Sequence, residues 1–102
     1  MMAEEKKDDS VFELVAAELA SAMANHRAFN SSHEGLAVLL EEFEELKHEV
    51  FQRDQDAARM REEAVQVAAM AIRFLVDVCG VRLVKRGQGG VVAFGGGEVS
   101  DG

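Results

Sequence analysis

Hydrophobic residues recur along this chain with the three-and-four spacing of amphipathic helices. Three stretches carry this spacing, over about residues 10–26, 32–53 and 56–79, and short polar segments separate them. Ser10 stands where a helix N-cap is expected, and Glu13 follows it at capping-box spacing. No proline interrupts any of the three stretches. The pattern therefore predicts an all-α fold with three main helices.

The second stretch carries an apolar arc beside an acidic stripe. On a helical wheel of about 100° per residue, a set of apolar side chains falls within about 120°. This set is Leu36, Leu39, Leu40, Phe43, Leu46 and Val50. Glu42, Glu45 and Glu49 form a stripe that borders the arc, whereas Glu41 and Glu44 point away from it. Only the first three glutamates are therefore expected to reach a seam with a neighbouring helix.

The third stretch is apolar on nearly every side, and a helix of this kind must be buried on most faces. One chain with three helices can hardly supply that cover. We therefore expect a small helical bundle completed by self-association, as a homodimer or a homotetramer. The few polar residues of this stretch form a single stripe: Glu62, Glu63, Gln66, Arg73 and Asp77. Within it, Arg73 and Asp77 have the spacing of an ion pair on one helix face.

The two ends of the chain differ from its helical part. Residues 1–9 are strongly charged, so we expect a disordered tail there. Gly80 is expected to end the third helix, which gives a helical domain over residues 10–80. Most of the glycines follow that domain. We therefore expect residues 81–102 to form a flexible Gly-rich tail or a weak hairpin.

Length and charge limit the class of protein. A chain of 102 residues that is 48% hydrophobic predicts one small globular domain. The net charge of −8 argues against a nucleic-acid backbone or an anionic membrane as the main partner. The longest apolar run, residues 67–72, is far too short to cross a bilayer, and the N-terminal residues lack the apolar core of a signal peptide. Because the single cysteine, Cys79, cannot form an internal disulfide, we expect a cytoplasmic location.

Two pairs of side chains have the spacing of a metal site. Glu42 and Glu45 lie about one turn apart on one predicted helix, and Glu63 and Gln66 repeat that spacing on the next. The turn between these helices is short, so antiparallel packing would bring the two pairs face to face. Three carboxylates and one amide oxygen are hard donors, which suit Mg²⁺ or Mn²⁺ rather than Zn²⁺ or Cu²⁺. Such a cation would allow an acidic chain to bind a phosphate ligand.

The same residues resemble the EExxE…ExxD signature of the MazG-like nucleoside triphosphate pyrophosphohydrolases. The two motifs here are Glu41-Glu42-x-x-Glu45 and Glu63-x-x-Gln66, and the resemblance covers about half of the chain. It implies an all-α, oligomeric enzyme that hydrolyses NTPs or dNTPs to the monophosphate and pyrophosphate. It also implies that these four side chains (Glu42, Glu45, Glu63 and Gln66) hold Mg²⁺, with the glutamates as catalytic residues. The family has an aspartate where this chain has Gln66, and a neutral amide binds Mg²⁺ more weakly.

Three other interpretations remain open at this point. Glutamate is a good helix former, and a run of glutamates is often only a solvated helix face. Glu45 and His48 have the Glu-x-x-His spacing of carboxylate-bridged di-iron bundles, although the wheel turns His48 towards solvent. A non-catalytic helical dimer that binds a protein partner is the third interpretation, and Gln66 in place of a fourth carboxylate favours it.

Overall fold

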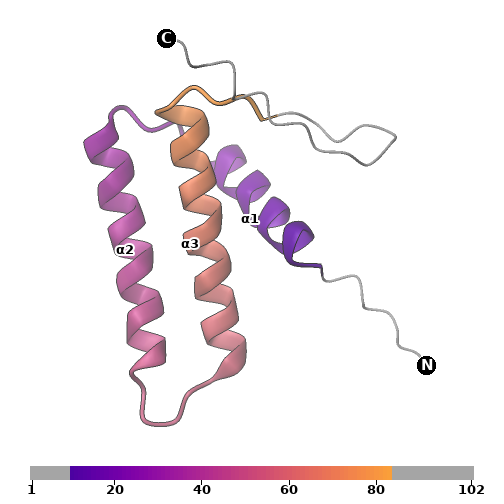
Figure 1. Cartoon of the computed structure of the whole chain (residues 1–102), viewed down its shortest axis with the longest axis vertical. Coiled ribbons are helices and arrows are strands. Elements are labelled where there is room, and N and C mark those ends of the chain that lie inside the picture. Colours follow the sequence, from indigo (N-terminus) through magenta and orange to yellow (C-terminus); the bar gives the residue numbers. More distant parts are fainter. Residues whose placement is uncertain (1–9, 84–102) are drawn as a thin grey trace, which may run out of the picture.

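The computed structural model describes residues 10–83, which contain three α-helices and no strand. The helices are α1 (Val11–Asn25), α2 (Ser32–Val50) and α3 (Ala57–Asp77) (Figure 1). The prediction of an all-α fold with three main helices is thereby confirmed for these residues. The predicted N-terminal tail at residues 1–9, and most of the Gly-rich segment with its possible hairpin, lie outside the described residues.

Each helix begins at a side chain that accepts a backbone hydrogen bond, which satisfies an N–H group left free at the helix start. The Ser10 hydroxyl accepts from the Glu13 amide at 3.1 Å, as the sequence predicts. Ser31 caps α2 in the same way, at 3.1 Å from the Glu34 amide. The Asp56 carboxylate accepts from two amides in the first turn of α3, at 3.0 and 3.3 Å.

The helices end slightly earlier than the pattern predicts. α2 stops at Val50 instead of Arg53, because the side chains of Gln52 and Gln55 donate to carbonyls of its last turn, at 3.0 and 2.8 Å. α3 stops at Asp77 instead of Cys79. Gly80 then adopts a φ of 76°, a left-handed conformation that turns the chain away from the helix axis.

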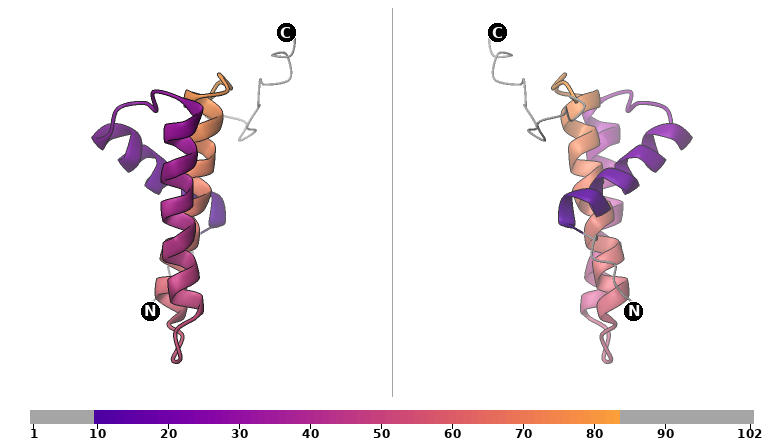
Figure 2. Two further views of the ribbon diagram at one scale, coloured as in Figure 1. Left: turned by 90° about the vertical axis from the view of Figure 1, so that its left-hand side faces the viewer. Right: turned by 90° about the vertical axis from the view of Figure 1, so that its right-hand side faces the viewer.

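Helices α2 and α3 run antiparallel, and α1 crosses them obliquely and packs mainly on α3 (Figures 1 and 2). The buried core is small because α1 contacts the hairpin over a limited length. Its apolar members are Leu19, Ala22, Phe29, Ala69 and Met70. No helix within residues 10–83 is long and apolar enough to cross a membrane.

A single chain leaves much of the predicted apolar arc of α2 uncovered. Leu36, Leu40 and Phe43 are each about half exposed, at 51, 52 and 51%. On α3, Ala71 and Leu75 are also exposed. The expectation that α3 is buried on most faces is therefore not met within one chain, because α1 and α2 cover only part of its surface.

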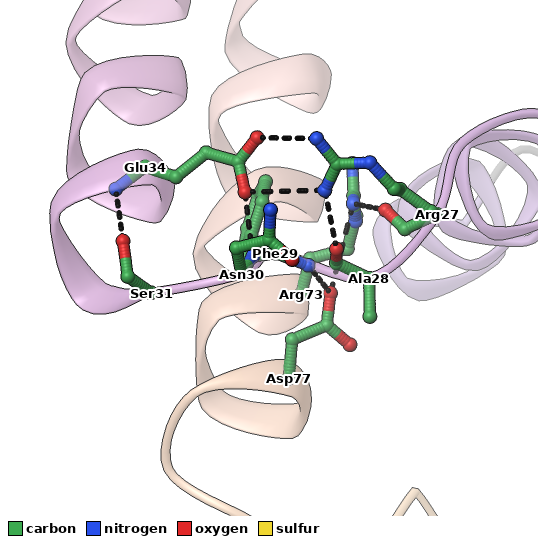
Figure 3. A network of polar contacts seen from close by, with 8 residues as sticks. All are labelled: Arg27, Ala28, Phe29, Asn30, Ser31, Glu34, Arg73 and Asp77. Carbon is green, nitrogen blue, oxygen red and sulfur yellow. Dashed lines mark hydrogen bonds and ion pairs between the residues drawn. The ribbon is translucent and has the colours of Figure 1, made fainter.

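Arg73 holds the loop between α1 and α2 against α3, and it is only 4% exposed (Figure 3). Its Nη2 donates to the Arg27 carbonyl at 2.8 Å and lies 3.6 Å from the Asp77 carboxylate. The same carboxylate accepts the Phe29 amide at 3.1 Å, and the guanidinium lies 4.0 Å from the Phe29 ring centroid. The predicted Arg73–Asp77 ion pair is thus confirmed. Its role in fixing the loop is an addition from the structure.

We expect Arg73→Met to destabilise the chain by about 3–5 kcal/mol, because it leaves the Asp77 carboxylate buried without its cation. Urea unfolding followed by circular dichroism measures this loss. Arg59→Met, at an exposed position of the same helix, is the matched control and should change stability by less than about 0.5 kcal/mol. A loss below about 1 kcal/mol for Arg73→Met would show that the buried pair does not hold the loop.

Gly35 of α2 lies directly against the side chains of Phe74 and Phe29. A methyl group at this position would lie 2.7 Å from Cδ2 of Phe74 and 3.1 Å from Cδ2 of Phe29. Gly35→Ala should therefore destabilise the chain by about 1–2 kcal/mol, despite the better helix propensity of alanine. The double variant with Phe74→Leu should recover part of this loss in the same urea titration. Equal or higher stability of Gly35→Ala would contradict the proposed crowding.

Candidate metal centre

Three carboxylates from two helices meet in the seam of the α2–α3 hairpin. Glu42 and Glu45 lie one turn apart on α2, and Glu63 lies across from them on α3. Each offers a carboxylate oxygen, and these oxygens all lie within 4.8 Å of one another. We call Glu42, Glu45 and Glu63 the acidic trio. The antiparallel packing of the two helices produces this approach, because it sets the second half of α2 beside the first half of α3.

The acidic trio is electrostatically strained. Oε1 of Glu42 and Oε1 of Glu63 are buried, and neither has a hydrogen-bond partner among the described residues. Burial, followed by the charges of Glu45 and Glu63, raises the pKa of the Glu42 carboxyl above its ordinary value. Burial, followed by the charge of Glu45, likewise raises the pKa of Glu63. Negative charge at the trio therefore opposes folding.

Gln66 lies one turn beyond Glu63 on α3 and is half-buried. It lines an open pocket of about 470 Å³ that also includes Glu42. The far wall of the pocket comes from α1, through residues such as Glu18 and Asn25, and Arg73 lines it as well. Of the acidic trio, Glu42 therefore shares this pocket with Gln66, whereas Glu45 and Glu63 do not line it. Sequence reasoning missed the contribution of α1, because its polar residues follow the ordinary pattern of a solvated helix face.

The other candidate ligands named from the sequence lie outside the trio. Glu49 is half-buried, and together with Glu62 it contributes to the raised pKa of Glu63. Glu41 is exposed and faces the pocket instead of the trio. His48 is exposed, and its ring lies 3.1 Å from the Gln52 side chain. His48 is not part of the acidic trio. A di-iron site would need Glu45 and His48 at the same metal, and the structure does not bring these two residues together there.

The donor set fits a hard divalent cation. Mg²⁺ and Mn²⁺ bind carboxylate oxygens, and the two partnerless buried oxygens are free to act as ligands. A cation would also reverse the repulsion within the trio. Zn²⁺ and Cu²⁺ favour imidazole and thiolate ligands, and the trio contains neither.

Comparisons with protein-family models, with curated proteins and with solved structures found no match for this chain. The geometry and chemistry of its own side chains therefore indicate what the centre can do.

The raised pKa values predict that the metal-free chain loses stability as the pH rises. A carboxyl group whose pKa is higher in the folded chain binds more protons when folded, so ionisation at neutral pH favours unfolding. With metal removed by a chelator, Glu63→Gln should melt about 3 °C above the unsubstituted chain at about pH 7.5, and at nearly the same temperature at about pH 4. Calorimetry at both pH values measures this difference.

Glu44→Gln is the control for this measurement, since Glu44 lies on the exposed side of α2 outside the trio. It should show no gain that grows with pH. If Glu63→Gln melts at or below the temperature of the unsubstituted chain at neutral pH, the carboxylate is already compensated and the trio is not strained.

Proposed function

We propose that this chain is a Mg²⁺-dependent or Mn²⁺-dependent nucleoside triphosphate pyrophosphohydrolase, which converts an NTP or dNTP to the monophosphate and pyrophosphate. The observation that carries the proposal is the acidic trio, in which two buried carboxylate oxygens have no partner among the described residues. Stability alone does not account for such a group, because uncompensated burial of charge opposes folding. Perturbed carboxylates beside a pocket are a frequent property of functional sites.

Each member of the site has a role in this proposal. Glu42, Glu45 and Glu63 hold the cation with their carboxylates, and Gln66 completes or orients the site with its amide oxygen. When bound, Mg²⁺ neutralises phosphate charge and lowers the pKa of a bound water. Glu42 and Glu63 are half-buried, whereas Glu45 is exposed. Bulk water is therefore partly excluded from two of the three carboxylates, which strengthens their interaction with a cation.

The pocket supports a substrate of nucleotide size. Its volume of about 470 Å³ lies within the range of about 300–1,000 Å³ that is usual for small-molecule sites. It begins at Glu42, so a ligand held at the trio has adjacent space between α1 and the hairpin. The chain carries a net charge of −8, so a triphosphate needs a cation to bind here at all.

The resemblance to the MazG-like signature adds to this proposal. Its signature includes the three members of the acidic trio, and its fourth position is Gln66, which lines the pocket with Glu42. Gln66 lowers the formal charge of the site by one relative to the family pattern. We therefore expect weaker Mg²⁺ binding than four carboxylates would give.

A second candidate is a non-catalytic helical dimer that binds a protein partner. Gln66 and the exposed apolar side chains of α2 favour it. Both candidates include self-association as a homodimer or a homotetramer. They differ in whether the trio turns over nucleotides or serves only as part of a binding surface.

Pyrophosphate release from a panel of NTPs and dNTPs, with Mg²⁺ or Mn²⁺, tests the proposal. We expect turnover by the unsubstituted chain, and a decrease of at least about 100-fold for Glu45→Ala because a ligand of the cation is lost. Gln66→Asp should increase turnover or lower the metal concentration required. Glu44→Ala, which removes a carboxylate of the same helix outside the trio, should retain activity.

The outcomes separate the two candidates. Turnover by Gln66→Asp alone would identify a chain that keeps the site but has lost activity through this substitution. The proposal would be overturned if neither the unsubstituted chain nor Gln66→Asp released pyrophosphate and Mg²⁺ did not change the melting temperature. That result would favour the partner-binding dimer.

A further inference from the structure

An apolar face of the α2–α3 hairpin has no cover among the described residues. On a wheel of about 100° per residue, Leu36, Leu40 and Phe43 of α2 form one stripe, and each is about half exposed. Leu75 continues the face on α3, where it is 47% exposed. On the wheel, both stripes lie on the side of their helix opposite its pocket-lining residues, such as Val38 of α2 and Gln66 of α3. We call this surface the apolar face.

The two helices contribute side chains of different size to the apolar face. α2 presents large residues, whereas α3 presents small ones until Leu75. The alanines of the α3 stripe are Ala64, Ala68 and Ala71, of which the first and last are exposed. A stripe of alanines alone has many explanations. Its position beside an equally spaced stripe of large apolar residues is the observation that matters here.

The register of the hairpin sets these residues at matching heights. Gly35 lies against Phe74 near one end of the hairpin, and the acidic trio joins the two helices near its middle. Counting helical turns from these two contacts shows which residues of α2 and α3 lie at the same height, that is, at the same position along the axis of the hairpin. Leu36 lies level with Ala71, Leu40 level with Ala68, and Phe43 level with Ala64.

We propose that a second copy of this chain covers the apolar face, through a two-fold axis parallel to the helices that sets α2 of each copy on α3 of the other. Rotation about such an axis leaves heights along the bundle unchanged. Each large residue of α2 therefore meets an alanine of the second copy: Leu36 meets Ala71, Leu40 meets Ala68 and Phe43 meets Ala64. The result is a four-helix bundle with large-to-small packing on both sides of the axis.

The other two-fold arrangement fits less well. An axis across the hairpin would set α2 on α2 and α3 on α3. Large side chains would then oppose large ones, while the alanines of the two copies would leave a gap between them. Packing at the density of a protein interior favours the first arrangement, since both overpacking and voids are unfavourable.

The distribution of charge allows a second copy to approach at this face. Two chains of net charge −8 repel each other unless they meet where carboxylates are few. The carboxylates of the trio and the pocket lie on other sides of the hairpin. Glu44 stands at the edge of the apolar face, where Lys47 lies 3.5 Å from its carboxylate. Approach through this face therefore keeps most of the negative charge apart.

The apolar face is large enough for a specific dimer. A helix of 19 residues, the length of α2, is about 28 Å long, and two packed helices are about 18 Å wide. The flat area is thus roughly 500 Å² per copy, or roughly 1,000 Å² in total before side chains interdigitate. This reaches the size at which specific interfaces begin.

Sedimentation equilibrium of the full chain tests the proposal. We expect a species of twice the chain mass of 11.1 kDa. Leu40→Glu places a charge in the centre of the face and should raise the dimer dissociation constant by at least about 30-fold. His48→Glu introduces the same side chain at an exposed position of α2 away from the face, and should leave the constant within about threefold. Circular dichroism shows that each variant is folded.

A size exchange between two facing positions tests the pairing of helices. Leu36→Ala and Ala71→Leu should each raise the dissociation constant by about tenfold, through a void and through overpacking. The double variant restores a large residue opposite a small one, and should return to within about threefold of the unsubstituted chain. If the two effects add instead, the helices do not pair as proposed.

A monomeric unsubstituted chain at all concentrations would overturn the proposal and indicate that another segment or another protein covers the face. A dimer that Leu40→Glu leaves intact would also overturn it, because the copies would then meet elsewhere. Neither result depends on pyrophosphate release. The inference about self-association and the proposed hydrolysis can therefore fail separately.

Discussion

The antiparallel packing of α2 on α3 is the contact on which the other features of this chain depend. It brings Glu63 to Glu42 and Glu45 across the seam, although these residues are far apart along the chain. The same packing needs Gly35, because any side chain at that position would meet Phe74. Arg73 then ties the loop of α1 to α3, which closes one wall of the pocket beside the trio. A shift of one helix along the other would disturb all of these contacts together.

The hairpin contains a local conflict at the candidate centre. Other local signals agree with the fold: capped helix starts, a left-handed glycine after α3 and a buried ion pair, although Nε of its Arg73 also lacks a hydrogen-bond partner among the described residues. At the trio, like charges approach one another with two oxygens unpartnered. Sequences tend to break local rules where function requires it. The conflict is therefore the strongest argument for a cation, and it is independent of any family resemblance.

Sequence patterns predict the local features of this chain well and its long-range contacts poorly. Helix spans and the Ser10 cap follow from spacing, and the approach of Glu42, Glu45 and Glu63 follows from spacing together with a short turn. The contacts of Arg73 with Arg27 and of Asp77 with Phe29 join residues more than forty positions apart, at 46 and 48 residues, and no periodicity encodes them. A helical wheel also gives the direction of a side chain without its partner. For that reason the apolar arc of α2 predicts burial that the single chain supplies only in part.

One side of the hairpin must stay open to solvent and the other is most stable when covered, and one arrangement meets both requirements. The pocket side is polar, is lined by carboxylates and must stay open if a phosphate ligand is to reach the trio. The apolar face is most stable when it is covered. Because these surfaces lie on opposite sides of the hairpin, a second copy on the apolar face would leave the pocket accessible. It would also contact both α2 and α3 on that face. These contacts would hold the two helices together against the mutual repulsion of the carboxylates of the trio. Self-association and a cation site are therefore compatible, and pairing would help to hold the strained trio in place.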